Sequence, residues 1–406
     1  MACGGGDTAG PGQDLSFKAR AQARENAPSN SSTPGTPAAE LSTTERAEVQ
    51  RRSREWATGS LLGTSATSNG LTVPPLYFGL AFTLEAAAQG DTLVSLRSAL
   101  PATSSAAVSA ALQQGLQRTL RAGESTVLPT AFFNSVTATE RPGSFSHLTL
   151  LPLTAAQLQR EPNLRAAVSD AVSGNWPWPQ VAGYRATWAS PTGGLLDVAM
   201  LRIQGPTRGL NGNGWDGRAM ALSGGHWLVK IEPWAALASW GAADMNAALA
   251  SATEALNQPD AAAPVETTWE LPEMGSSSTT ELNDRRGMGL AQDTVNANLR
   301  GLDGGGTYAV PSSGFASMGL TSTGFGYNGS QSVEFIFSPL NIFGPGFSSG
   351  GYASVSVDLS GTYLLPICPA ATVNLRPFFL ALLQPSGNIA LLARLSSFGG
   401  TACTNR

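Results

Sequence analysis

The carboxyl-terminal part of the chain carries the clearest hydrophobic pattern. An almost unbroken apolar run over residues 373–384 is followed by Pro385-Ser386-Gly387-Asn388 and a second apolar run over residues 389–395. Proline followed by glycine and asparagine between two short apolar runs is typical of a β-hairpin, and strands that are apolar at nearly every position are buried on both faces. We therefore expect a hairpin in the core of the protein.

Alternating patterns predict further strands. Ala316, Met318 and Leu320 alternate with small residues, which is the period of two expected of a half-buried strand. Two short β-like runs joined by Gly224-Gly225 predict a second hairpin over residues 218–232. The other strand candidates are residues 126–137, 195–204, 265–274 and 332–337.

Helical signals begin with Ser42-Thr43-Thr44-Glu45, a capping-box pattern that predicts a helix ending near Leu62. A second helix is expected to follow, because Pro74 suits a first helical turn and Gly90 suits a helix end. The residues between them are apolar on nearly every face, so this helix should be buried. Other segments with helical composition are residues 104–122, 162–172, 234–256 and 279–287.

The motif Trp176-Pro177-Trp178-Pro179 predicts an extended loop, because a residue before proline is driven away from helical conformation. Tryptophan-proline runs can form ligand platforms. Large aromatic side chains more often bury their apolar surface in the protein itself, so we expect this loop to be packed against the core.

Composition narrows the classes of protein. The chain has 406 residues, of which 42% are hydrophobic, enough for a large core in one big domain or two medium ones. Its net charge of -4 gives no indication of nucleic acid as a partner. No apolar run is long enough to span a bilayer. Residues 1–40 consist mainly of small and polar residues and predict a disordered tether, so the folded domain is expected to occupy residues 41–406.

The three cysteines suggest an extracytoplasmic protein. Met1-Ala2-Cys3 followed by glycines resembles the processed start of a bacterial lipoprotein, in which Cys3 would carry a lipid and anchor the protein to the cell envelope, although the apolar signal segment is missing. On this interpretation the protein is secreted or lipid-anchored, and Cys368 and Cys403 can form a disulfide. Two free buried thiols are an equally good interpretation.

Two motifs with possible chemistry fail their structural requirements. Gly346-Phe347-Ser348-Ser349-Gly350 fits the nucleophile elbow of hydrolases, but a strand rather than a helix is expected after it, and His147 and His226 both precede it. Residues 324–329 match the glycine pattern of dinucleotide-binding proteins. That pattern needs a helix N-terminus after it to hold the pyrophosphate, but the segment that follows is β-like. With two histidines and no cysteine pair at metal-ligand spacing, no metal or cofactor is expected.

Several segments resemble the serpin family. Arg376-Pro377-Phe378-Phe379, Ser386-Gly387-Asn388 and Leu392-Ala393-Arg394 are similar to the carboxyl-terminal hairpin of serpins. Residues 297–302, followed by a strand and then by Gly329-Ser330, are similar in order to the segment that leads to the hinge of the serpin reactive loop. The resemblance implies an α+β fold, with helices packed around a large mixed or antiparallel sheet, a smaller β-barrel-like part and a long exposed reactive loop.

The function that the resemblance implies is inhibition of a serine protease by cleavage of the reactive centre loop and covalent trapping, with no catalytic residue in the chain itself. The implied hinge is Gly329, Ser330, Gln331 and Ser332. Counting from this hinge places the scissile bond at Phe343-Gly344, whereas counting back from Pro377 places it near Pro366.

Residues 301–375 contain no lysine or arginine, which disfavours a trypsin-like target. A chymotrypsin-, elastase- or subtilisin-like protease is therefore the expected partner of a monomeric protein.

Some residues depart from the family pattern. Pro74 and Tyr77 stand where the family usually has serines, Thr207 stands near the place of an expected tryptophan, and Glu334 and Phe335 replace small residues of the loop. These departures favour the alternative of a non-inhibitory serpin-like binding module.

Overall fold

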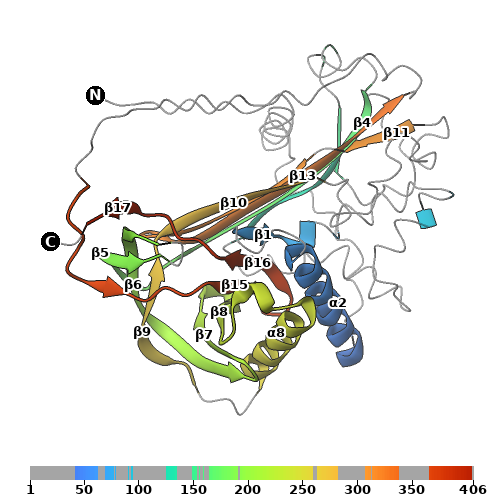
Figure 1. Ribbon diagram of the computed structural model, residues 1–406. Coiled ribbons are helices and arrows are strands. Elements are labelled where there is room, and N and C mark those ends of the chain that lie inside the picture. The colour runs from blue at the N-terminus through green and yellow to red at the C-terminus, as the bar shows by residue number, and fades with distance from the viewer. Residues whose placement is uncertain are drawn as a thin grey trace.

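Figure 1 shows the computed structural model of the chain. The structure describes residues 42–62, 69–76, 78, 90, 93–94, 125–134, 149–152, 155, 159, 164–190, 193–258, 263–281, 307–311, 313–337 and 365–404. The expected tether, the expected helix over residues 104–122 and the segment 338–364 lie outside these residues.

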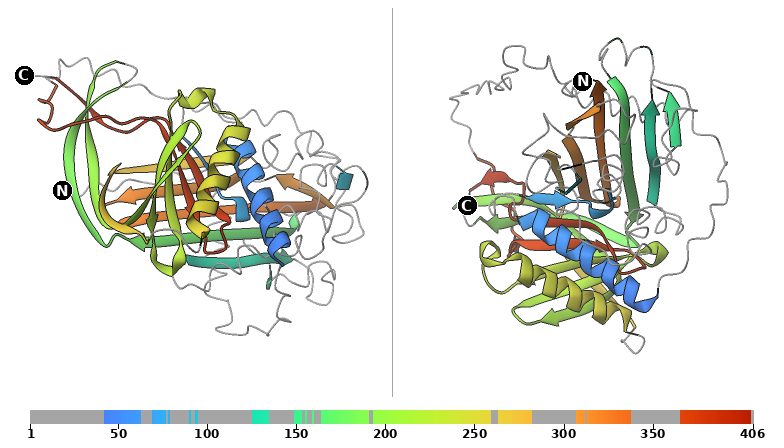
Figure 2. Two further views of the ribbon diagram at one scale, coloured as in Figure 1. Left: turned by 90° about the horizontal axis from the view of Figure 1, so that it is seen from below. Right: turned by 90° about the vertical axis from the view of Figure 1, so that its right-hand side faces the viewer.

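Two long helices pack side by side on one face of the molecule (Figure 2). Helix α2 (Thr43–Leu62) begins at the predicted capping box, where the Glu45 carboxylate accepts a hydrogen bond from the Ser42 backbone N–H (3.0 Å) and the Ser42 hydroxyl accepts one from the Glu45 N–H (3.2 Å). Helix α8 (Ala242–Asn257) lies within the segment 234–256 that was predicted to be helical, apart from its last residue. Both predictions are confirmed.

The larger of two sheets has ten strands, and these helices cover one of its faces. Its order is β1 (Gly70–Thr72), β16 (Ile389–Leu395), β15 (Phe378–Leu383), β8 (Trp227–Pro233), β7 (Trp215–Ala221), β6 (Leu195–Gly212), β5 (Gln180–Ala189) and β14 (Thr372–Val373). Strands β9 (Val265–Pro272) and β17 (Thr401–Cys403) also pair with β6. This sheet is open, so the described residues do not form the barrel-like part that was expected.

The smaller sheet has seven strands and packs on the other face of the ten-stranded sheet. Its order is β10 (Met274–Glu281), β12 (Ser313–Thr321), β13 (Gly324–Phe337), β4 (Leu164–Pro177), β2 (Ser125–Asn134) and β3 (Thr149–Pro152), with β11 (Thr307–Pro311) pairing with the end of β13. All pairs are antiparallel except β2 with β3. The right-hand view of Figure 2 shows the resulting layers of helices, sheet and sheet.

The predicted carboxyl-terminal hairpin lies in the middle layer, the ten-stranded sheet. Every residue of β15 and β16 is buried. Alternate residues face opposite layers: Leu380 and Leu382 join the cluster between the sheets, whereas Phe379, Ala381 and Leu383 join the cluster under the helices. A strand covered on both sides needs apolar residues at every position, which explains the unbroken apolar run.

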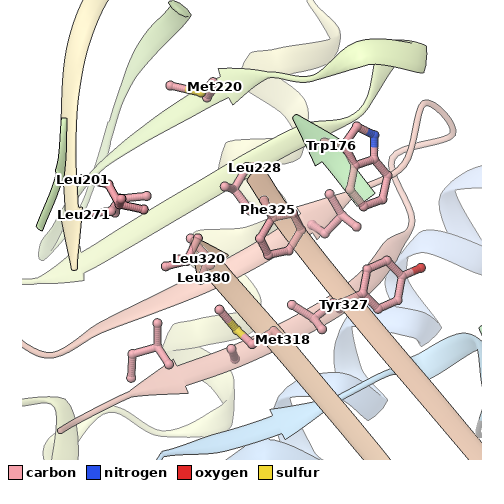
Figure 3. Packing of buried hydrophobic residues seen from close by; sticks show 14 of the residues in the cluster. Trp176, Leu201, Met220, Leu228, Leu271, Met318, Leu320, Phe325, Tyr327 and Leu380 are labelled. Carbon is pink, nitrogen blue, oxygen red and sulfur yellow. The ribbon is translucent and has the colours of Figure 1, made fainter. Parts of the chain in front are cut away.

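The core between the two sheets is built from large side chains of both sheets (Figure 3). Leu320, Phe325 and Tyr327 come from the seven-stranded sheet, and Leu228 and Leu380 come from the ten-stranded sheet. Leu320, Phe325, Leu228 and Leu380 are completely buried. This apolar layer fixes the position of β12 and β13 relative to the hairpin.

Two helix predictions were wrong. Residues 164–172 belong to strand β4, and Thr279, Thr280 and Glu281 belong to strand β10. The alanine-rich composition of the first segment favours a helix. The backbone N–H and C=O groups of β4 instead form hydrogen bonds with β13 on one side and β2 on the other. Tertiary contacts therefore override the local helical preference.

Strand β9 offers a matched test of this core. Leu271 is fully buried beside Leu201, whereas Val265 at the start of the same strand is 64% exposed. We expect Leu271→Ala to lower the free energy of unfolding by about 2–5 kcal/mol, because it leaves a cavity between the sheets. Val265→Ala should cost less than about 1 kcal/mol. Urea unfolding would measure both changes, provided that the slope of the unfolding free energy against urea concentration stays the same. Equal losses of unfolding free energy in the two variants would contradict the assigned packing.

Candidate functional site

Strand β13 is the element on which the functional assignment depends. Its 14 residues pair with β4 along nearly the whole length and with β12 through Ser330, after which β11 takes over the second edge. The chain reaches β13 from β12 through only two residues, Ser322 and Thr323. β13 is thus an interior strand, antiparallel to every neighbour.

The expected hinge residues lie inside this strand. Gly329, Ser330, Gln331 and Ser332 pair with residues 169–172 of β4, and Gly329 and Ser330 are buried. The expectation that an exposed loop begins at Gly329 was therefore wrong for this conformation, because the chain has already turned at Ser322. The function of these residues as a hinge stays a prediction.

Gly329 fits its position because it has no side chain. A Cβ atom there would lie 2.5 Å from Cδ1 of Leu76 and 3.2 Å from Cγ2 of Val73. Pro74, Pro75, Leu76 and Phe78 form the buried start of the second predicted helix, whose later part, apart from Gly90, lies outside the described residues. The helix start thus packs directly against the middle of β13.

The turn before β13 is held by tryptophan and threonine side chains. The indole N–H of Trp178 donates a hydrogen bond to the carbonyl oxygen of Thr321 (2.7 Å). The Thr321 and Thr323 hydroxyls are 2.8 Å apart, and the Ser322 N–H donates to the Glu273 carboxylate (3.2 Å). Because Trp178 is buried, its N–H has to find a partner in the protein, and the turn supplies one.

The first residue of β13 also has to be glycine. A Cβ atom on Gly324 would lie 2.4 Å from the carbonyl oxygen of Trp176 and 3.0 Å from Cα of Pro177. Both contacts are with backbone, which cannot rotate away. A side chain here would separate the start of β13 from the end of β4.

An aromatic cluster lies next to this turn, between the end of β4 and the start of β13. Trp176, 1% exposed, stacks on Phe325 (ring centroids 5.8 Å apart) and on Tyr327 (6.0 Å), and its other neighbour is His226 (5.0 Å). The His226 ring nitrogen Nδ1 is 3.3 Å from the Ser223 carbonyl oxygen. Burial raises the pKa of the Tyr327 phenol well above its usual value, so this phenol stays neutral. The cluster therefore holds β13 by dispersion and apolar burial.

The contact of Trp178 with the turn before β13 was not predicted from the sequence. The family resemblance led us to expect a tryptophan where the loop enters the sheet, and Thr207 was assigned to that place. Thr207 instead lies in β6, where its hydroxyl hydrogen-bonds to that of Thr267. The signal was the Trp-Pro-Trp-Pro motif, whose expected packing into the core is confirmed because Trp176 and Trp178 are both buried. The expected loop was wrong for Trp176 and Pro177, which form the end of strand β4.

Other predicted sites are distributed as follows. Phe343, Gly344 and the Gly346–Gly350 motif lie outside the described residues, as does Cys3. Residues 324–329 are strand, so the fingerprint-like run has no dinucleotide-binding context. Cys368 and Cys403 form a disulfide, which decides between the two interpretations. Among the described residues, no group of three or more potential ligands could hold a metal, and no helix is long and apolar enough to cross a membrane.

Comparison with solved structures connects this arrangement to a known fold. No protein-family model matches the sequence, and no curated protein matches it. A structure described as a loop C-sheet serpin polymer matches with a TM-score of 0.61 at 12% identity, covering 90% of this chain and 99% of that one. The cleaved serpin 42Da matches with a TM-score of 0.62 at 10% identity, covering 86% and 99%.

The thermophilic serpin tengpin in the latent state matches with a TM-score of 0.60 at 13% identity, covering 89% of this chain and 99% of that one. Identities this low show the fold alone. They confirm the α+β architecture expected from the resemblance. This chain therefore has the same fold as the serpins.

Proposed function

We propose that this protein inhibits a serine protease, and that residues 324–337 become strand β13 as part of that inhibition. The observation that supports this proposal is the position of β13 in the interior of the seven-stranded sheet, between β12 and β4. Structures with the same fold include ones described as cleaved, loop-inserted and latent. In the inhibitory form these residues would lie outside the sheet, and the structure would represent the inserted form.

Insertion of this strand supplies a driving force. Each backbone hydrogen bond gained contributes about 0.5–1.5 kcal/mol net. Burial of a large apolar side chain such as Phe325 contributes about 1.5–3 kcal/mol more. The protease would contribute the nucleophile, and this chain would contribute the cleaved bond and the strand that moves the attached protease away.

The proposed target is a chymotrypsin-, elastase- or subtilisin-like protease. The absence of lysine and arginine from residues 301–375 leaves a trypsin-like specificity pocket without a charged partner. Because β13 extends to Phe337, the bond to be cut would follow that residue, and both Phe343-Gly344 and a bond near Pro366 meet this condition.

We also propose an extracytoplasmic location, with Cys3 as a lipid attachment site. The disulfide between Cys368 and Cys403 supports this location, because such bonds persist in oxidising compartments.

A non-inhibitory binding module is the second candidate. Phe325 and Tyr327 are large, and both are locked against Trp176 in the core. A strand anchored in this way could belong to the sheet from the first folding event, in which case no insertion would follow cleavage.

The first prediction separates these two candidates. The protein is incubated with chymotrypsin, elastase and subtilisin, and the products are separated on denaturing gels with and without reductant. An inhibitor should give a band at the summed mass of the two proteins that survives denaturation, because the acyl-enzyme is covalent. Sequencing of the released peptide would locate the cut. Clean cleavage by all three proteases without this band would favour the binding module.

A second prediction tests insertion itself. Gly324→Ala should convert the inhibitor into a substrate, because its Cβ would lie 2.4 Å from a backbone oxygen of β4. Gly326→Ala is the matched control, since its Cβ would meet only ordinary contacts at 3.4 and 3.5 Å. Ser330→Arg should act like Gly324→Ala, because Ser330 is 4% exposed. The ratio of trapped complex to cleaved protein measures all three, and an unchanged ratio in Gly324→Ala and Ser330→Arg would rule out the insertion mechanism.

A further inference from the structure

Residues 365–373 form a short segment that is held on two sides at the end of the ten-stranded sheet. On one side, Thr187 of β5 binds it twice: the Thr187 N–H donates to the Ala371 carbonyl and the Thr187 hydroxyl donates to the Pro369 carbonyl, both at 2.7 Å. Strand β14 then adds a two-residue parallel pairing with Thr187 and Trp188. These contacts attach the segment to the edge of the sheet.

On its other side the segment is joined to the end of the chain. The Cys368 N–H donates to the Thr404 carbonyl, and the Thr404 N–H donates to the Pro366 carbonyl, both at 3.0 Å. The disulfide from Cys368 to Cys403 adds a covalent link. Strand β17, which contains Cys403, pairs with Leu195, Leu196 and Asp197 of β6.

These contacts close a ring. Strands β5 and β6 are neighbours, with Thr187 opposite Asp197 and Trp188 opposite Leu196. The segment 365–373 therefore touches β5, β5 pairs with β6, β6 pairs with β17, and β17 returns to the segment through the disulfide. We call residues 365–373 together with residues 401–404 the clasp.

The clasp depends on these bonds because it buries little apolar surface. Leu365 is 47% exposed and Ile367 is 58% exposed, whereas every residue of β15 and β16 is buried. Elements with few buried contacts open at low free-energy cost without unfolding of the core. The disulfide, with a sequence separation of 35, keeps an opened segment close to its partners and so favours reclosure.

We propose that the Cys368–Cys403 disulfide acts as a redox switch, in which reduction releases residues 365–373, with strand β14, from β5 while the rest of both sheets stays folded. The reductant would be a dithiol. Its first thiolate attacks Sγ of Cys368 and Cys403 leaves as the thiolate; the second thiol then displaces Cys368 and closes a disulfide in the reductant. Two electrons pass to the protein and both cysteines end as thiols.

Attack at Cys368 follows from its accessibility. Cys368 is half-buried among exposed neighbours, whereas Cys403 is 5% exposed. This inference does not depend on inhibition of a protease, because it concerns only the attachment of the clasp.

Hydrogen exchange on the full chain tests the proposal. Three amides report on the clasp, namely those of Thr187, Cys368 and Thr404, because each donates one of the bonds described above. After treatment with dithiothreitol without denaturant, we expect their exchange to accelerate by about tenfold or more, while exchange in β15 and β16 stays unchanged. The variant with Cys368→Ser and Cys403→Ser should match the reduced protein, and Cys3→Ser should match the oxidised wild type.

Two neighbouring glycines provide a test that leaves the disulfide intact. A Cβ on Gly400 would lie 2.9 Å from Cγ1 of Val198 and 3.0 Å from the Asp197 carbonyl oxygen, whereas a Cβ on Gly399 would meet nothing within 4 Å. Gly400→Ala should therefore push β17 away from β6 and accelerate exchange at the three clasp amides even in the oxidised protein. Gly399→Ala should leave their exchange unchanged.

Three results would overturn the proposal. The disulfide could stay oxidised in excess dithiothreitol, as measured by thiol labelling; the clasp amides could exchange at the same rate after reduction; or exchange in β15 and β16 could rise in step with them, which would make the disulfide a support of the whole fold. If the double serine variant fails to fold, reduction of the folded wild type decides between these outcomes.

Discussion

The contact between the end of β4 and the start of β13 is the constraint on which the rest of the structure depends. Trp178 fixes the Thr321 carbonyl, and the missing side chain of Gly324 lets the two backbones meet. Once the chain turns at Ser322, the alternation of β13 sends Phe325 and Tyr327 onto Trp176. A change at this point would shift the register of the strand and carry its aromatic residues away from the core.

The other half of the architecture is organised by the carboxyl-terminal hairpin. Its two faces belong to two different clusters, so residues of the middle layer connect the helices on one side with the seven-stranded sheet on the other. Loss of packing on one face of β15 should therefore also weaken the packing on its other face. The clasp stands outside this arrangement, because its attachment rests on hydrogen bonds and one disulfide.

The parts that could be predicted from the sequence were those with strong local signals. The unbroken apolar run of the hairpin, the capping box of α2 and the alternation of β12 each follow from one physical requirement that the residues themselves display. Strand β4 could not be predicted, because its helix-forming alanines are overruled by neighbours more than 30 residues away in the sequence. The reactive loop was expected to begin at Gly329 for a similar reason: glycine next to a second backbone and glycine in a loop look the same in one sequence.

The pairing of β1 with β16 has a consequence for how the chain can fold. Gly70 lies opposite Arg394, so β1 cannot pair with β16 until about 320 further residues have been synthesised. Strand β8 similarly pairs with β15 across about 150 residues. The core layer therefore cannot form on the ribosome until the carboxyl-terminal hairpin has emerged, and contacts of such long range make folding slow. Until then the edge of β8 that pairs with β15 stays unpaired and apolar. The nascent protein therefore needs protection from aggregation while this edge is exposed.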